Sequence, residues 1–315
     1  MRRKDKGVKR KNQKANIYEE AKSNLERKYE AGKGRSKHRD KSQNGGKVPM
    51  EYIYMITTLH LYVRILKSYR AYLEKYRLRY YSLQHMALYL QSYVYYLDDI
   101  GYSAWTIKTY VSALKKALDI KGHIWTPTRH RINTRRSREH ANARYLREKS
   151  KKYKRHILFC ICTGLRKYKE LACVRGTDLL YYGSTPYLFV PKGKAGQARE
   201  VQIIGTQAEI QCVVKMCEDA GQDLVFPEIP RDLDVHALRA IYACRVYLHA
   251  ARNLDMVERE NLYVYRNDMG GLVTDKVAMW IASEYLGHHR ISVIATSYMW
   301  ALDFVRSADF SWLAE

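Results

Sequence analysis

The chain has 315 residues, 46% of them hydrophobic, which is enough for two domains that each bury a core. Lysines and arginines number 56 against 32 aspartates and glutamates, so the formal net charge is +24 and a polyanion such as nucleic acid is the expected partner. The sequence holds no run of about 18 apolar residues, and no apolar stretch follows its basic start. We therefore expect a cytoplasmic protein that is neither secreted nor associated with a membrane.

Residues 1–48 form the first segment, with 17 lysines and arginines, 6 acidic residues and few large apolar side chains. This composition indicates a basic, flexible arm that contacts phosphates without reading bases. The alternative is a solvated tail with no function of its own.

Residues 49–122 predict a small helical domain. Its first helix is indicated by apolar residues at spacings of three and four, namely Met55, Leu59, Tyr62, Leu66, Tyr69 and Leu73. A second helix is expected from Ser82 to Asp99, with Ser82 as its N-cap, and Gly101 ends that pattern. Ser103 is the expected N-cap of a third helix, whose apolar face is formed by Ile107, Tyr110, Val111, Leu114 and Leu118.

The rest of the chain divides into a linker and a second domain. Residues 123–150 are rich in arginine and contain Pro127, which predicts a basic interdomain linker. Residues 151–315 predict a mixed domain with a β-hairpin, whose strands lie at 187–190 and 200–204. Helices are expected at 157–162, after Gly164, and around 206–220, 236–251 and 274–285. The expected fold class is mainly α with a small β-hairpin, an α+β arrangement.

The cysteines and tyrosines give only general information. Six cysteines lie in the second domain, without a Cys-x-x-Cys pair or zinc-like spacing: Cys160, Cys162, Cys173, Cys212, Cys217 and Cys244. We expect reduced, mostly buried thiols, as in a cytosolic protein, and no metal site. There are 28 tyrosines, so composition does not single out any one of them.

Four sequence blocks of the second domain carry side chains suited to phosphate chemistry. The blocks are Thr163-Gly164-Leu165-Arg166, the hairpin turn with Lys192 and Lys194, His236-Ala237-Leu238-Arg239, and Leu286-Gly287-His288 followed by Tyr298. Each block alone is common; His236 and Arg239, for example, are three apart and would simply share a helix face. Together they supply two arginines, a lysine, two histidines and a tyrosine.

Metal-free phosphoryl transfer requires this combination of side chains. Guanidinium groups clamp charged phosphate oxygens bidentately, and a tyrosine hydroxyl can attack phosphorus and hold a DNA end covalently. A lysine or a histidine can give a proton to the leaving oxygen. The sequence has no cluster of carboxylates suited to Mg²⁺, which argues against a two-metal nuclease, and no ATP or other cofactor is expected.

In their order and approximate spacing, the four blocks resemble the catalytic motifs of the tyrosine recombinase, or phage integrase, family. The resemblance covers about residues 50–305 and includes Gly101-Tyr102-Ser103-Ala104-Trp105-Thr106-Ile107, which is similar to the family's N-terminal core-binding domain. It implies a core-binding domain at 49–122 and a catalytic domain at 151–315. The implied activity is site-specific DNA recombination through a 3′-phosphotyrosine intermediate, in integration or excision of a mobile element or virus.

The resemblance also implies a role for each residue. Arg166 and Arg239 would clamp the scissile phosphate, and Tyr298 would attack it. His236 would assist proton transfer from Tyr298. His288 would hydrogen-bond the phosphate and stabilise the charge of the transition state.

The hairpin lysine and the acidic position need further comment. Lys194 would protonate the departing 5′ oxygen, and we prefer it to Lys192 because Arg199 follows it by five residues, as in the family. The family's acidic residue lies three positions after the first arginine. Here Lys169 is at that place and Glu170 comes one residue later.

The interval between the second histidine and the tyrosine also departs from the family pattern. It is ten residues from His288 to Tyr298, whereas nine is commoner, and His289 would give nine. We prefer His288 because Leu286 and Gly287 directly precede it.

The resemblance further implies double-stranded DNA as the partner, a nucleoid-associated location, a homotetramer on two DNA sites, and an accessory DNA-bending or excision factor. The large apolar residues near the carboxyl end, most of them aromatic, suit either docking onto a neighbouring subunit or folding back onto their own domain: Trp300, Phe304, Phe310, Trp312 and Leu313. Other functions stay open. They are a resolvase or topoisomerase of the same chemistry, a non-catalytic DNA-binding protein derived from a recombinase, and a basic RNA-binding protein.

Overall fold

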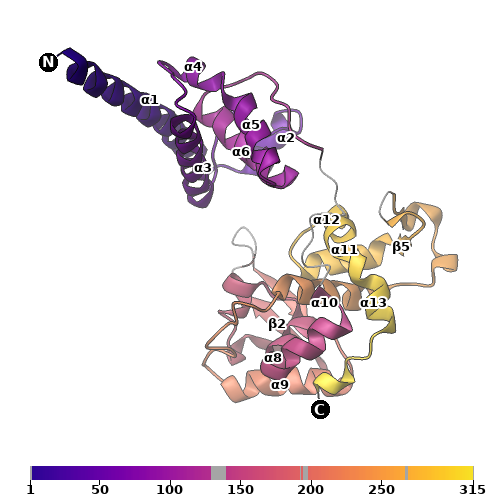
Figure 1. Ribbon diagram of the computed structural model, residues 1–315. Coiled ribbons are helices and arrows are strands. Elements are labelled where there is room, and N and C mark those ends of the chain that lie inside the picture. Colours follow the sequence, from indigo (N-terminus) through magenta and orange to yellow (C-terminus); the bar gives the residue numbers. More distant parts are fainter. Residues whose placement is uncertain (1, 129–139, 192, 194–197, 267–268, 315) are drawn as a thin grey trace. The chain divides into compact units, whose positions relative to one another are not determined.

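The computed structural model describes residues 2–128, 140–191, 193, 198–266 and 269–314, with side chains from residue 16 onward except His38. The chain divides into two compact units, Met1–His130 and Arg131–Glu315, and each is described by itself. Helices predominate, and the strands in the described ranges form two small antiparallel sheets (Figure 1). The expected fold class is confirmed. Among the described helices, none is long and apolar enough to cross a membrane.

The first unit is a group of helices around one apolar core (Figure 1). They are α1 (Arg2–Gly32), α2 (Lys37–Gln43), α3 (Ile56–Lys75), α4 (Leu83–Ala87), α5 (Leu90–Asp99) and α6 (Ala104–Ala117). Ser82 and Ser103 cap α4 and α6, because each hydroxyl accepts a hydrogen bond from the backbone N–H three residues on, at 3.1 Å and 3.2 Å. The single helix expected after Ser82 is two helices, since the N–H groups of Leu88 and Tyr89 bond three residues back instead of four.

Helix α1 corrects the interpretation of residues 1–48 as a flexible arm. Ile17, Ala21 and Leu25 are buried in the helical core, the last two completely. The side chain of Asn24 also donates a hydrogen bond to the carbonyl of Ala117, at 3.0 Å. The three apolar residues recur every four positions and so share one helix face. That periodic signal is short, and the basic composition around it obscures it.

The second unit is built around α10 (Val235–Ala250), which packs against α8 (Ala143–Thr163), α11 (Lys276–Tyr285) and α13 (Leu302–Ser307). Most side chains of α10 are buried on all sides, as expected for a central helix. The other α-helices are α9 (Gln207–Ala220) and α12 (Ile291–Ser297). Short helical turns lie at Lys167–Leu171, Gly176–Asp178, Leu254–Met256, Arg259–Asn261, Met299–Ala301 and Ser311–Leu313.

The expected hairpin is part of a three-stranded antiparallel sheet in the order β1-β2-β3. Its strands are β1 (Leu179–Tyr182), β2 (Thr185–Val190) and β3 (Arg199–Gln202). Leu188 of β2 is opposite Val201 of β3, and both side chains are fully buried. Strand β1 was not among the elements predicted from the sequence. A second sheet pairs β4 (Leu262–Val264) with β5 (Val273–Asp275).

The boundary between linker and second domain also differs from the expectation. Helix α8 begins at Ala143, inside the segment 123–150, and the side chain of Asn142 caps it by accepting a hydrogen bond from the backbone N–H of Tyr145, at 2.9 Å. Tyr145 and Leu146 are buried in the core of the second unit. Residues from about 140 onward therefore belong to this unit and not to a linker.

The chain after Tyr298 folds back onto its own unit. Phe310 and Leu313 are buried in the core of that unit. The ring of Phe310 meets the ring of Phe304 edge-on at 5.9 Å, and the guanidinium of Arg245 lies 4.9 Å from its centroid. Of the two alternatives for the aromatic residues near the carboxyl end, this structure shows the folded-back arrangement.

Candidate active site

Five of the six predicted catalytic residues lie together in the second unit. An open pocket of about 450 Å³ is lined by Arg166, Lys167, Leu233, Asp234, Val235, His236, Arg239 and Tyr298. His288 joins the group through a contact with the Tyr298 hydroxyl. The sixth residue, Lys194, and its alternative Lys192 lie outside the described residues.

Tyr298 is at the carboxyl end of α12, with only 3% of its surface exposed. The Nε2 atom of His288 lies 2.9 Å from the Tyr298 hydroxyl oxygen, and the Nε atom of Arg239 donates to the same oxygen at 3.4 Å. The ring of His236 lies beside the Tyr298 ring, with the centroids 5.4 Å apart. The hydroxyl thus has an imidazole and a guanidinium as direct neighbours.

The turn after α11 explains why His288, and not His289, meets Tyr298. Gly287 has a positive φ of 63°, and the N–H of His288 donates to the carbonyl of Ser283 at 2.9 Å. These two features form a glycine-dependent helix cap that reverses the chain. The next residue, His289, points to Glu284 at 2.9 Å and is half exposed. The Leu-Gly-His block is therefore a structural cap that also aims the imidazole of His288.

The two predicted clamp arginines converge on one backbone carbonyl. Arg166 donates to the carbonyl of Leu286 at 3.0 Å, and Arg239 donates to it at 2.5 Å. Arg239 also donates to the carbonyl of Gly164. Burial lowers the pKa of the Arg239 guanidinium, although the nearby Tyr298 opposes this effect. An arginine carries five N–H donors, and the three hydrogen bonds described for Arg239 use one donor on each of its nitrogens.

The glycine of the Thr-Gly-Leu-Arg block, Gly164, is required by the backbone conformation and by close packing. Gly164 ends α8 with a φ of 59°, a conformation that side chains disfavour. A Cβ atom built there would lie 2.2 Å from a ring carbon of Tyr242. Only glycine fits this position, and it lets the chain turn so that Arg166 reaches the pocket.

Glu170 is the residue of the site to which the sequence analysis gave no role. Its side chain is fully buried and accepts hydrogen bonds from the backbone N–H of Arg166 at 2.9 Å and from its Nη1 atom at 2.6 Å. Arg199 donates to both Glu170 oxygens, at 2.9 Å and 2.7 Å. Burial acts to raise the pKa of Glu170, but the hydrogen bonds and charges of Arg199, Arg239 and Arg166 outweigh it and lower the pKa to about 2.

A π-helical turn explains the late position of Glu170 in the sequence. Over Lys167–Leu171, the N–H of Leu171 donates to the carbonyl of Arg166, five residues back, at 2.8 Å. Such a turn contains one more residue than an α-helical turn. The additional residue brings Glu170, rather than Lys169, under Arg166.

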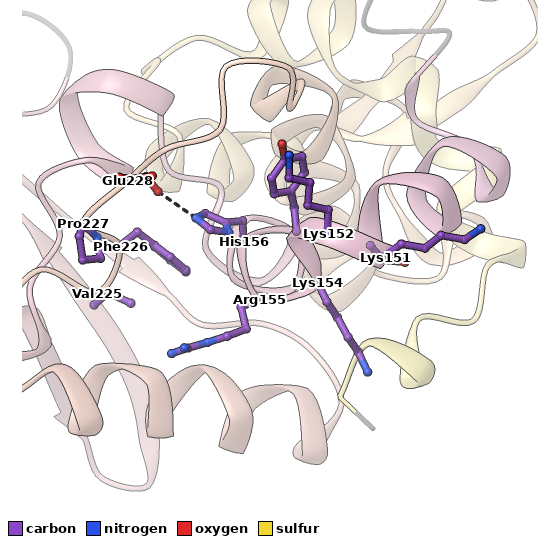
Figure 2. A pocket seen from close by; sticks show the side chains of 11 residues that line it. Lys151, Lys152, Lys154, Arg155, His156, Val225, Phe226, Pro227 and Glu228 are labelled. Carbon is purple, nitrogen blue, oxygen red and sulfur yellow. Dashed lines mark hydrogen bonds between the residues drawn. The ribbon is translucent and has the colours of Figure 1, made fainter.

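A second, strongly basic pocket lies apart from these residues, where α8 is kinked at Tyr153. Figure 2 shows His156 directed toward Phe226 and Glu228, and its ring stacks on Phe226 with the centroids 4.3 Å apart. The cationic side chains around it are Lys151, Lys152, Lys154 and Arg155. None of the ion pairs within the described ranges involves these four cations. The Lys152 ammonium lies 5.3 Å from the centroid of the Tyr153 ring.

No protein-family model matches the sequence, and no curated protein matches it. Solved structures similar to the chain include a XerH site-specific recombinase bound to palindromic difH substrate, with 15% identity, a TM-score of 0.46, and coverage of 94% of this chain and 92% of that chain. A pre-cleavage complex of XerH with difH substrate has 15% identity, a TM-score of 0.47 and coverage of 89% and 90%. A Tn1549 transposon integrase in complex with circular intermediate DNA has 13% identity, a TM-score of 0.41 and coverage of 87% and 95%.

Proposed function

We propose that this protein is a site-specific DNA recombinase that cuts and rejoins DNA through a covalent 3′-phosphotyrosine at Tyr298. The observation that carries the proposal is the position of the Tyr298 hydroxyl, which contacts an imidazole and a guanidinium at the edge of a pocket lined by Arg166 and Arg239. A nucleophile with a base and a cationic clamp beside it is the arrangement that phosphoryl transfer requires. Double-stranded DNA is the proposed partner, consistent with the net charge of +24.

The proposed first step moves two protons and exchanges one bond at phosphorus. The Tyr298 oxygen attacks the scissile phosphorus while its proton passes to His288, whose Nε2 atom is 2.9 Å away. The bond from phosphorus to the 5′ oxygen breaks, and that oxygen leaves as a 5′ hydroxyl after taking a proton. Arg166 and Arg239 neutralise the non-bridging oxygens. A 5′ hydroxyl of the partner duplex then attacks the phosphotyrosine and releases Tyr298.

This assignment exchanges the expected roles of the two histidines. His288 takes the proton because it hydrogen-bonds the hydroxyl, and His236 lies exposed among the pocket-lining residues, where it is placed to hydrogen-bond the phosphate. Lys194 remains the proposed proton donor to the 5′ oxygen.

A free basic arm at residues 1–48 would favour integration over the resolution of DNA dimers, because resolvases of this chemistry are often more compact. Residues 17–32 form part of the helical core, so they do not support that preference. We propose recombination between two DNA sites. Three further expectations stay predictions: integration or excision of a mobile element, a tetrameric assembly and an accessory factor.

The test is a covalent selection that does not require a known target sequence. The full chain is incubated in chelator with nicked duplexes that carry a randomised centre, and protein–DNA adducts that survive denaturation are isolated and sequenced. We expect one family of duplexes to be enriched, with the nucleotide attached to the peptide that contains Tyr298.

Two tyrosine variants complete the selection. Tyr298→Phe removes the nucleophile and should abolish the adduct. Tyr265→Phe removes the hydroxyl of another buried tyrosine of the same unit, which contacts Met279, and should leave adduct formation intact. An adduct that persists in Tyr298→Phe would show that another residue is the nucleophile. Salt-sensitive DNA binding without any adduct would favour the non-catalytic DNA-binding alternative.

A further inference from the structure

The orientation of Arg166 depends on a carboxylate that no external anion can reach. The side chain of Glu170 is fully buried beneath the pocket, and it accepts hydrogen bonds from both the backbone and the guanidinium of Arg166. The Nη1 atom of Arg239 lies 3.8 Å from the same carboxylate. A buried charge of this kind must be matched by cations around it. The positive charge that Arg166 and Arg239 can offer a phosphate therefore depends on which arginine neutralises the charge of Glu170.

Arg199 is the arginine whose side chain bonds both oxygens of Glu170. Its two terminal nitrogens donate to the two carboxylate oxygens, at 2.9 Å and 2.7 Å, so that the planar fork fixes the orientation of the carboxylate. The Arg199 side chain is 8% exposed and is not among the pocket-lining residues. It contacts neither the nucleophile nor the space in which a phosphate would lie.

Arg199 also supports the backbone on which the two clamp arginines converge. Its Nε atom donates to the carbonyl of Tyr285 at 2.8 Å, next to the carbonyl of Leu286 that accepts from Arg166 and Arg239. Its Cδ atom packs so closely on Gly287 that a Cβ there would lie 3.2 Å from it. The Arg199 side chain therefore contacts both groups that hold the two clamp arginines, namely the Glu170 carboxylate and the turn after α11.

We propose that Arg199 is a positioning residue for DNA cleavage, which holds Glu170 and the Tyr285–Gly287 turn so that Arg166 and Arg239 keep both their geometry and their full charge for the scissile phosphate. The proposal rests on the proposed function. With Arg199 present, three guanidinium charges face one carboxylate, and two positive charges remain. Without Arg199, Glu170 is matched by Arg166 and Arg239, and only one remains.

The test compares single-turnover adduct formation and DNA affinity on a duplex recovered from the covalent selection. Arg199→Met should slow adduct formation about 100-fold, with the Kd for the duplex changed less than about threefold. Arg199→Lys should restore little, because one ammonium cannot bond both carboxylate oxygens and the Tyr285 carbonyl together. Arg199→Met combined with Glu170→Gln restores the two uncompensated charges, and we expect adduct formation at least tenfold faster than in Arg199→Met alone.

The matched control is Arg245, which forms the same kind of pair elsewhere in the unit. It donates to both oxygens of the fully buried Glu209, at 2.7 Å and 2.8 Å, and it does not line the pocket. Arg245→Met should destabilise the protein comparably while leaving the adduct rate, measured below the unfolding temperature, within about threefold of the wild type. Equal rates in Arg199→Met and Arg245→Met, or no gain from the added Glu170→Gln, would overturn the proposal.

A second readout separates this proposal from the proposed function. In protein labelled with ¹⁵N-arginine, the Nε–H signal of Arg166, assigned with Arg166→Lys, should shift and broaden in Arg199→Met but not in Arg245→Met. If the wild type forms no adduct but the Arg166 signal still changes in Arg199→Met, the proposed function is wrong. The positioning of Arg166 by Arg199 is then still supported. If the wild type forms adducts and the signal of Arg166 is unchanged in Arg199→Met, Arg199 has no positioning role.

Discussion

The Nε2 atom of His288 and the hydroxyl oxygen of Tyr298 lie 2.9 Å apart, although the residues are separated by ten positions in the chain. The cap at Gly287 and the helix α12 together close this distance. The contact places an imidazole nitrogen directly beside the hydroxyl of the proposed nucleophile, and it makes the proposed role of each histidine testable.

Replacing His288 by Gln should lower the rate of adduct formation by about 10² to 10⁴, because a positioned general base contributes that much. His289→Gln is the matched control, since His289 points to Glu284 instead. We expect its rate to stay within about threefold of the wild type in the same single-turnover assay. Equal effects of the two substitutions would remove the distinction that the structure draws between these neighbours.

Glu170 should make the stability of the second unit depend on pH. Its pKa is lowered from 4.5 to about 2, so its contribution is fully present above pH 4.5 and is lost as the pH falls toward 2. The shift corresponds to about 3 kcal/mol of unfolding free energy. Glu170→Gln should therefore destabilise the protein by roughly that amount at pH 7, and by progressively less below pH 4.5.

Urea unfolding at several pH values measures this dependence. Glu200→Gln is the control, because Glu200 lies on the surface and bonds only Tyr182 among the described residues. A destabilisation by Glu170→Gln that is the same at pH 7 and pH 3 would contradict the role of its ionised form.

The basic pocket around the kink of α8 should contribute to DNA affinity but not to chemistry. Lys151→Gln combined with Lys154→Gln should reduce the salt dependence of DNA binding by about two in the slope of log K against log salt, one for each lysine that contacts a phosphate. The control is Lys215→Gln, an exposed lysine of α9 that pairs with Asp219. If the slope of log K against log salt is unchanged in the double variant, the DNA backbone does not contact Lys151 and Lys154.

The packing of α1 predicts a large effect from a residue in the supposed arm. Leu25 is completely buried, so Leu25→Ala should destabilise the first unit by about 2 to 5 kcal/mol. Deletion of residues 2–14 should change its stability much less. Thermal unfolding of the two variants distinguishes a packed helix from a flexible arm, because truncating Leu25 in a flexible arm would have no effect.

The local elements of this protein could be predicted from the sequence because their signals lie within a few residues of one another. Serine caps at Ser82 and Ser103, the spacing of apolar residues in α3 and α6, and the hairpin strands are all set by neighbours in the chain. The ordered motif blocks likewise identified Arg166, His236, Arg239, His288 and Tyr298, five residues that the structure brings into one site.

Only the tertiary structure decided how these parts meet. The convergence of Arg166 and Arg239 on the Leu286 carbonyl joins three distant segments, and no local pattern encodes it. Glu170 and Arg199 form an ion pair although they are 29 residues apart, because a buried carboxylate is stable only when cations surround it. Helix α1 joined the core for a related reason: its narrow apolar face stays out of water only where α3 and α6 cover it, and that cover lies far along the chain.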